Sequence, residues 1–136
     1  MLADDVAAVL PELRAQAESL MQDECTVDRA TGETTLDPVT LEEVPVFAPV
    51  YSGKCRIQRA DHQPSDIVSG QVEFGISTVF AQLPLSATGI KRGDVVTVTA
   101  IDPTTDPDLL GMVAAVRANM TKTHPTKRTL VCEEVT

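Results

Sequence analysis

The sequence predicts a mainly β protein: a small antiparallel β-barrel or sandwich of about six strands, with an N-terminal α-helix and a long mid-chain loop. Two observations carry this prediction. The 17 valines and 16 threonines, both β-branched, make up about a quarter of the 136 residues. Most of the chain after residue 24 alternates between apolar and polar residues, as half-buried strands do. The length suits one domain, so we expect a single unit over 1–136, with a helix or arm in 1–21 and the barrel in 24–136.

The first 21 residues have the spacing of an amphipathic helix, because apolar side chains recur every three or four positions. Pro11 interrupts this pattern, since proline removes one backbone hydrogen bond and clashes with the preceding turn. We therefore expect the helix either to kink at Pro11 or to begin near residue 10 and leave residues 1–9 as an arm. The apolar positions are Leu2, Val6, Val9, Leu10, Leu13, Ala17, Leu20 and Met21.

Short strands are expected next. Alternation predicts one over residues 25–29, which ends at a turn formed by Thr31 and Gly32. Further along, Gly53 is expected to turn the chain into a second alternating strand over residues 54–59.

Between these strands lies an extended run, residues 44–50, with valines and alanine on alternate positions. Pro45 and Pro49 lie on its other face. Proline cannot donate a backbone hydrogen bond, so this run is expected to be an edge strand or an extended arm and not a central strand.

The second half of the chain begins with residues 60–71, which are polar and lack periodicity. They predict a long loop, and such loops often carry function. Alternation predicts strands over 72–80, 95–101 and 126–135. Residues 112–120 fit both a helix and a strand, and the β-rich surroundings favour a strand.

The charge is acidic and unevenly distributed. The net charge is −9, and residues 1–50 hold eleven Asp and Glu but only two Arg, whereas residues 51–136 hold nine charges of each sign. This balance argues against a protein that binds duplex DNA or anionic membranes, because both need clustered Lys and Arg. Aromatic residues make up 3%, too few for a single-strand stacking platform or a carbohydrate cleft.

Three cysteines, Cys25, Cys55 and Cys132, lie in predicted strands, and none has a partner at CxxC spacing. We expect reduced thiols in the core and a reducing, intracellular place of assembly. Asp4 and Asp5 do not suit a signal peptide, and no apolar run approaches the ~18 residues of a membrane span.

Catalytic and metal-binding signatures are weak. His62 and His124 lie in loop segments, and Asp61 beside His62 does not imply a nucleophile. The Arg-Gly-Asp triplet that ends at Asp94 is expected to be a charged turn. Three acids between residues 102 and 108 lack the spacing of a calcium loop and are expected to be solvated turn residues. A helix face and an edge segment remain as means of joining neighbours, although the helix could equally cap its own barrel.

Several segments follow one another in a characteristic order, together with a short N-terminal helix and a hairpin rich in Thr, Asp, Pro and Val. They are MQDECTVDR (21–29), VYSGKCRIQ (50–58), IKRGDVV (90–96), DPDLLG (106–111) and RTLVCEEV (128–135). In the order and spacing of these segments the chain resembles the head-to-tail stopper (head-completion) proteins of long-tailed phages that infect actinobacteria.

The resemblance implies a non-enzymatic structural protein of the virion neck, assembled in the host cytoplasm, without cofactor, metal or membrane. Such proteins form a six- or twelve-fold homo-oligomeric ring below the portal and adaptor. The ring closes the DNA channel after packaging and offers a platform to the tail terminator or tail tube, and DNA passes through it without sequence-specific binding. The family fold is a small β-barrel with an accessory helix, which also implies a strand over residues 112–120.

Two sets of site residues follow from this interpretation. The loop expected to face the channel contains Asp61, His62, Gln63, Pro64, Ser65, Asp66, Ile67 and Val68. The expected contacts with neighbouring subunits or the adaptor are Leu2, Val6, Leu10, Leu13, Val44, Val46 and Phe47. The alternatives are a tail terminator or another ring-forming tail protein, and a small ligand-binding or hydrolytic β-barrel with its site at Asp61 or His62.

Overall fold

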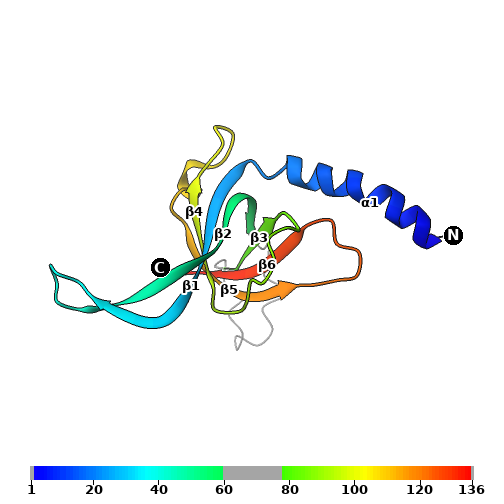
Figure 1. Ribbon diagram of the computed structural model, residues 1–136. Coiled ribbons are helices and arrows are strands. Elements are labelled where there is room, and N and C mark those ends of the chain that lie inside the picture. The colour runs from blue at the N-terminus through cyan, green and yellow to red at the C-terminus, as the bar shows by residue number, and fades with distance from the viewer. Residues whose placement is uncertain (1, 60–77, 136) are drawn as a thin grey trace, which may run out of the picture.

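The computed structural model describes residues 2–59 and 78–135. Six antiparallel strands close into a barrel in the order β1-β2-β3-β6-β5-β4, and a single α-helix precedes them (Figure 1). The predicted fold class is therefore confirmed. The elements are α1 (Leu2–Ser19), β1 (Asp23–Leu36), β2 (Glu43–Arg59), β3 (Thr78–Leu83), β4 (Val95–Ala100), a short 3₁₀ helix η2 (Pro107–Leu109), β5 (Val113–Met120) and β6 (Arg128–Glu134).

The barrel interior is filled by small and medium-sized apolar side chains that recur with the two-residue period of a strand. A six-stranded barrel has a narrow interior, which suits valine, alanine and cysteine better than aromatic rings. The buried set is Cys25, Val27, Cys55, Val79, Ala81, Leu83, Ala87, Ile90, Val96, Val98, Met112, Ala114, Val116, Leu130 and Cys132.

All three cysteines are buried free thiols, as the sequence predicts. A hydrogen bond with Cys25, together with burial, raises the pKa of the Cys55 thiol far above its ordinary value. Burial raises the pKa of Cys132 to about 12. The thiols of Cys55 and Cys132 therefore stay protonated near neutral pH, and all three cysteines act as small core side chains.

The hairpin of β1 and β2 is longer than predicted, and two expected turns are wrong. Residues 31–32 do not end the strand: β1 continues to Leu36, and a bulge with Gly32 at φ 86° absorbs the extra residues. The chain does not turn at Gly53, because β2 runs through it and pairs it with Cys25.

Gly53 serves a different purpose, since it makes room for a neighbouring ring. A Cβ atom at this position would lie 2.8 Å from the Tyr51 hydroxyl oxygen. That hydroxyl donates a hydrogen bond of 2.7 Å to the Lys54 carbonyl. Burial raises the pKa of Tyr51 to about 12.

The two prolines of β2 lie where no strand pairs with their other edge, which agrees with the predicted edge strand or arm. Only residues 56–59 of β2 pair with β3, and only residues 24–28 of β1 pair with β4. Pro45 pairs only with Thr34 of the same hairpin, and Pro49 pairs with Asp28 beside a bulge, so neither interrupts the β2–β3 ladder of the barrel.

The helix begins at Leu2 and passes through Pro11, so the expected start near residue 10 is wrong. Figure 1 shows α1 directed away from the barrel, on the side opposite the tip of the hairpin. None of its residues is buried.

The remaining strands largely agree with the alternation. The prediction of a strand over 112–120 is confirmed by β5, and β4 and β6 match their predicted ranges to within two residues. The strand predicted over 72–80 is observed from Thr78 and continues to Leu83, whereas residues 72–77 lie outside the described part of the chain.

Candidate interaction surfaces

The predicted channel-facing loop, Asp61 to Val68, lies outside the described residues, so the structure does not place His62 or its neighbours. His124 lies exposed in the connection between β5 and β6.

Three aspartates predicted to be turn residues lie in or beside turns. Asp102 accepts a hydrogen bond from the Thr104 N–H at 3.0 Å, and Asp106 accepts one from the Asp108 N–H, also at 3.0 Å.

The apolar stripe of α1 has no partner within the described chain. Two of the predicted contact residues, Leu2 and Leu13, are exposed (80% and 42%), and Val6 and Leu10 are half-buried. The helix is tied to the barrel near its C-terminal end, where Arg14 Nε donates to the Pro125 carbonyl at 3.0 Å. An ion pair of 3.4 Å between Glu18 and Lys54 reinforces this end.

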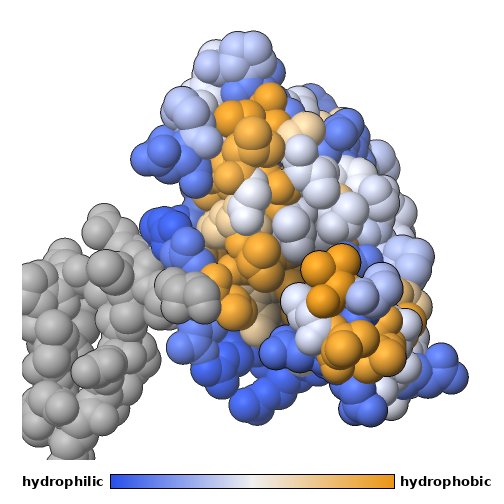
Figure 2. All heavy atoms as spheres, turned by 90° about the vertical axis from the view of Figure 1, so that its left-hand side faces the viewer, coloured by the Kyte–Doolittle hydropathy of each residue, from blue (hydrophilic) through white to orange (hydrophobic). Residues whose placement is uncertain are grey.

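The second projection is the outer part of the β1–β2 hairpin, residues 30–50, which we call the arm. Among the predicted contact residues on it, Val44 and Phe47 are exposed (41% and 48%) and Val46 is half-buried. Figure 2 views the molecule from the arm side and shows apolar atoms at the surface among polar ones. The structure thus places the predicted contact residues on two separate projections, α1 and the arm.

The tip of the arm carries three further exposed apolar side chains that the sequence interpretation missed: Leu36 at 58%, Val39 at 88% and Leu41 at 71%. They were missed because the turn was expected at residues 31–32. The signal was present in Asp37-Pro38, a dipeptide typical of turn initiation.

Asp37 organises this tip. Its Oδ1 accepts hydrogen bonds from the N–H groups of Val39 at 2.8 Å and Thr40 at 3.3 Å. These two bonds lower the pKa of Asp37. The Leu41 N–H donates to the Asp37 carbonyl at 2.8 Å, which closes the turn with Leu41 at φ 60°. The tip is therefore a preformed turn that displays Val39 and Leu41.

Both projections are acidic. The arm contains Glu33, Asp37, Glu42 and Glu43 and no Lys or Arg. In α1, four acids accompany a single base, Arg14. The charge asymmetry of the sequence therefore lies largely on the two elements that project from the barrel.

The arm is joined to the barrel through a buried carboxylate. The expected charged turn at Arg92-Gly93-Asp94 is present, but Asp94 is only 2% exposed. Its carboxylate faces Arg29, which lies at the root of the arm, so it is not available to an outside partner.

A pocket of about 360 Å³ lies between the end of α1, β2 and the β4–β5 connection. Its acidic groups hold the fold: Asp23 accepts hydrogen bonds from the Asp102 N–H at 2.9 Å and the Thr105 hydroxyl at 2.6 Å. No group of three His, Cys, Asp or Glu that could hold a metal ion occurs within residues 2–59 and 78–135. The lining residues are Leu20, Gln22, Asp23, Arg56, Ile57, Arg59, Thr105, Asp106 and Leu109.

These features define a small closed β-barrel with an acidic helix and an acidic hairpin arm that project from it. The chain belongs to the family of unknown function DUF6093, whose profile matches residues 13–133. The match covers the last part of α1, from Leu13, and the barrel except for the final residue of β6.

The fold is similar to the solution structure of protein SF1141 from Shigella flexneri 2a, with a TM-score of 0.56 and 16% sequence identity. The similarity covers 84% of this chain and 92% of that one. At this identity the comparison shows a shared fold. No curated protein matches the sequence. Among the described helices, none is long and apolar enough to cross a membrane.

Proposed function

We propose that this protein is a structural component of a phage neck, a head-to-tail stopper that forms a ring below the portal and adaptor. In this role it closes the DNA channel after packaging and presents a platform to the tail, without an enzymatic activity. The resemblance of the segment order to stopper proteins supports the proposal. The structural observation that carries it is the 18-residue helix without a buried residue, opposite an arm that extends beyond the barrel.

The helix is hard to explain as a feature of an isolated monomer. In proteins, most of the stability of a helix comes from tertiary packing of its apolar face and not from helix propensity. Here the barrel does not cover that face, and Pro11 weakens the helix further by roughly 3 kcal/mol. A partner that covers Leu2, Val9 and Leu13 supplies the missing packing, as a neighbouring subunit or the adaptor does in a ring.

The acidity also suits a conduit for DNA. A net charge of −9 repels the phosphate backbone and allows DNA to pass without adhering. In this proposal the residues of the 61–68 segment face the channel, and the ring is six- or twelve-fold.

The proposal is tested by negative-stain electron microscopy of the purified protein mixed with the portal and adaptor proteins of the same phage. We expect a ring on the tail-proximal end of the portal. If the protein does not bind the portal but binds the ends of tail tubes, it is a tail terminator and the proposal is wrong. His62→Ala separates the third alternative: loss of a hydrolytic or ligand-binding activity with ring assembly intact contradicts a purely structural role.

A further inference from the structure

We infer that the acidic arm of one subunit docks on a basic patch of the neighbouring subunit's barrel, so that the ring closes through repeated head-to-tail contacts. This inference rests on the proposed ring. The partner of the arm is therefore a second copy of the same chain. The basic patch consists of Lys91, Arg92, Arg117, Met120 and Lys122.

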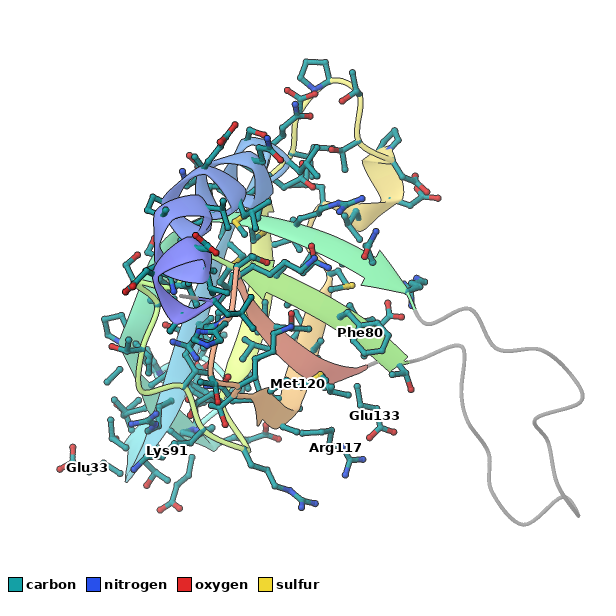
Figure 3. All side chains as sticks on the ribbon, turned by 90° about the vertical axis from the view of Figure 1, so that its right-hand side faces the viewer. Glu33, Phe80, Lys91, Arg117, Met120 and Glu133 are labelled. Atoms are coloured by element: carbon teal, nitrogen blue, oxygen red, sulfur yellow. The ribbon has the colours of Figure 1, made fainter. Side chains whose placement is uncertain are left out.

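The two segments that carry the patch lie side by side, because the β3–β4 connection is hydrogen-bonded to β5. The Asn119 side chain donates to the Ile90 carbonyl at 3.1 Å, and the Gly93 N–H donates to the Val116 carbonyl at 2.9 Å. Figure 3 shows Lys91, Arg117 and Met120 in the lower part of the barrel in that view. Met120 is 53% exposed and provides an apolar centre.

Most of the positive charge in the patch is uncompensated. Arg117, which lies at a bulge in β5, forms an ion pair with Glu133. The ion pairs of the described residues do not include Lys91, Arg92 or Lys122. These three side chains are exposed, so a partner can reach them without displacing an internal contact.

The arm is complementary to the basic patch in charge and also carries exposed apolar side chains. It combines four acids and no bases with the exposed apolar residues Leu36, Val39 and Leu41 at a preformed tip. The other projection, α1, is also acidic, and contact between the arm and a neighbouring helix therefore brings like charges together. The basic patch is free of this repulsion.

The tip of the arm extends away from the barrel, and therefore away from the patch of its own chain. About nine residues separate Val27, in the barrel wall, from Leu36, and at roughly 3.3 Å per residue the tip stands up to about 30 Å from the wall. Figure 1 shows this hairpin leading away from the barrel. When the arm of each subunit docks on the patch of the next, the contact is heterologous, and such contacts generate a ring when the rotation between subunits closes.

The test uses charge reversal on the two surfaces. Lys91→Glu, Arg92→Glu and Lys122→Glu together change the four cations of the patch to a net charge of −2. Glu33→Lys, Glu42→Lys and Glu43→Lys change the arm from −4 to +2 and keep Asp37, which organises the tip. Each variant is mixed with the portal and adaptor proteins, and rings are counted by negative-stain microscopy at 50 mM and 500 mM salt. Each variant alone is expected to form at least about tenfold fewer rings than the wild type at low salt.

An equimolar mixture of the two variants provides the matched control for misfolding. The acidic arm of one variant faces the basic patch of the other, and the basic arm of the second faces the acidic patch of the first. Rings with alternating subunits are therefore expected to return in the mixture. Wild-type rings are expected to decline at 500 mM salt, because screening weakens contacts between exposed charges.

The outcomes separate this inference from the proposed function. If the wild type forms no ring on the portal, both are overturned. If the wild type and both variants form rings equally well, or if the mixture does not restore the rings, the docking contact is wrong. The proposed ring below the portal is then still supported. The same holds if the patch variant loses affinity for duplex DNA in a gel-shift assay while its rings are unaffected, since the patch is then a DNA contact.

Discussion

Arg29 of β1 and Asp94 at the start of β4 form a two-pronged ion pair, with Nε–Oδ1 and Nη2–Oδ2 distances of 2.9 Å each. Arg29 Nη2 also donates to the Gly89 carbonyl at 2.7 Å, and the Lys91 N–H donates to Asp94 Oδ2 at 2.8 Å. One buried carboxylate therefore joins the root of the arm to the connection that carries Lys91 and Arg92. The pair fixes the direction in which the arm leaves the barrel.

Replacement of Asp94 by Ala is expected to lower the free energy of unfolding by about 1–3 kcal/mol, because the Arg29 guanidinium and the Lys91 N–H lose a buried, charged acceptor. Chemical denaturation measures the loss. Glu33→Gln is the matched control, since Glu33 is an exposed acid of the same hairpin and its change is expected to have little effect. Equal stability of both variants and the wild type contradicts the role given to the pair.

The pair also makes stability depend on pH. Burial alone raises the pKa of Asp94, but the hydrogen bonds from Arg29 and the Lys91 N–H outweigh burial, so the pKa lies below the ordinary value of 3.8. A carboxyl whose pKa is lower in the folded state stabilises the fold above the pKa of the unfolded chain. This contribution is lost as the pH falls through the lower folded value.

Denaturation series between pH 2 and pH 7 are therefore expected to show a steeper loss of stability below about pH 4 in the wild type than in Asp94→Asn. The asparagine variant lacks the titrating group at this site. Parallel curves for the two proteins contradict the assignment of this acid sensitivity to Asp94.

Gly53 and Tyr51 are expected to be coupled. In Gly53→Ala the new Cβ atom displaces the Tyr51 ring and breaks its hydrogen bond to Lys54, at a cost of about 1 kcal/mol. In a Tyr51→Ala background the same substitution meets no ring and is expected to cost clearly less. A double-mutant cycle measures the difference, and strictly additive effects exclude the proposed contact.

Pro11→Ala is expected to stabilise α1 by up to about 3 kcal/mol, since it restores a backbone donor in the helix interior. Hydrogen exchange of the α1 amides measures the change, with Glu12→Ala as an exposed control. The thermal midpoint of the barrel is expected to stay unchanged because no α1 residue is buried. An equal gain in barrel stability shows that the helix packs on the barrel after all.

The thiols of Cys25, Cys55 and Cys132 are expected to react with an aromatic disulfide reagent at pH 8 only when the protein unfolds. All three are buried, and those of Cys55 and Cys132 have raised pKa values. A Thr40→Cys variant, with an exposed thiol at the arm tip, provides the positive control. Fast reaction of the native wild-type protein contradicts the closed barrel core.

The barrel strands were predictable where one face of a strand is buried, because burial imposes the two-residue alternation on Val95–Ala100 and Arg128–Glu134. The arm was harder to predict. Both its faces are exposed, so alternation carries no information there, and Gly32 produces a bulge where a glycine more often marks a turn.

The candidate surfaces were predictable only in part. Apolar spacing identified Leu2 and Leu13, but such spacing cannot show whether the barrel or another molecule covers the stripe. The basic patch could not be predicted, because the Asn119–Ile90 and Gly93–Val116 hydrogen bonds bring two separate segments together. The burial of Asp94 could not be predicted either, because an Arg-Gly-Asp triplet ordinarily forms an exposed charged turn.

The most direct measurement is a cryo-electron microscopy reconstruction of the neck in intact virions of the phage that encodes this protein. The account predicts a ring of six-stranded barrels between the adaptor and the tail, with the arm of each barrel lying on the neighbouring subunit. A neck in which no density fits this barrel, or a barrel found only at the end of the tail tube, contradicts the proposed function.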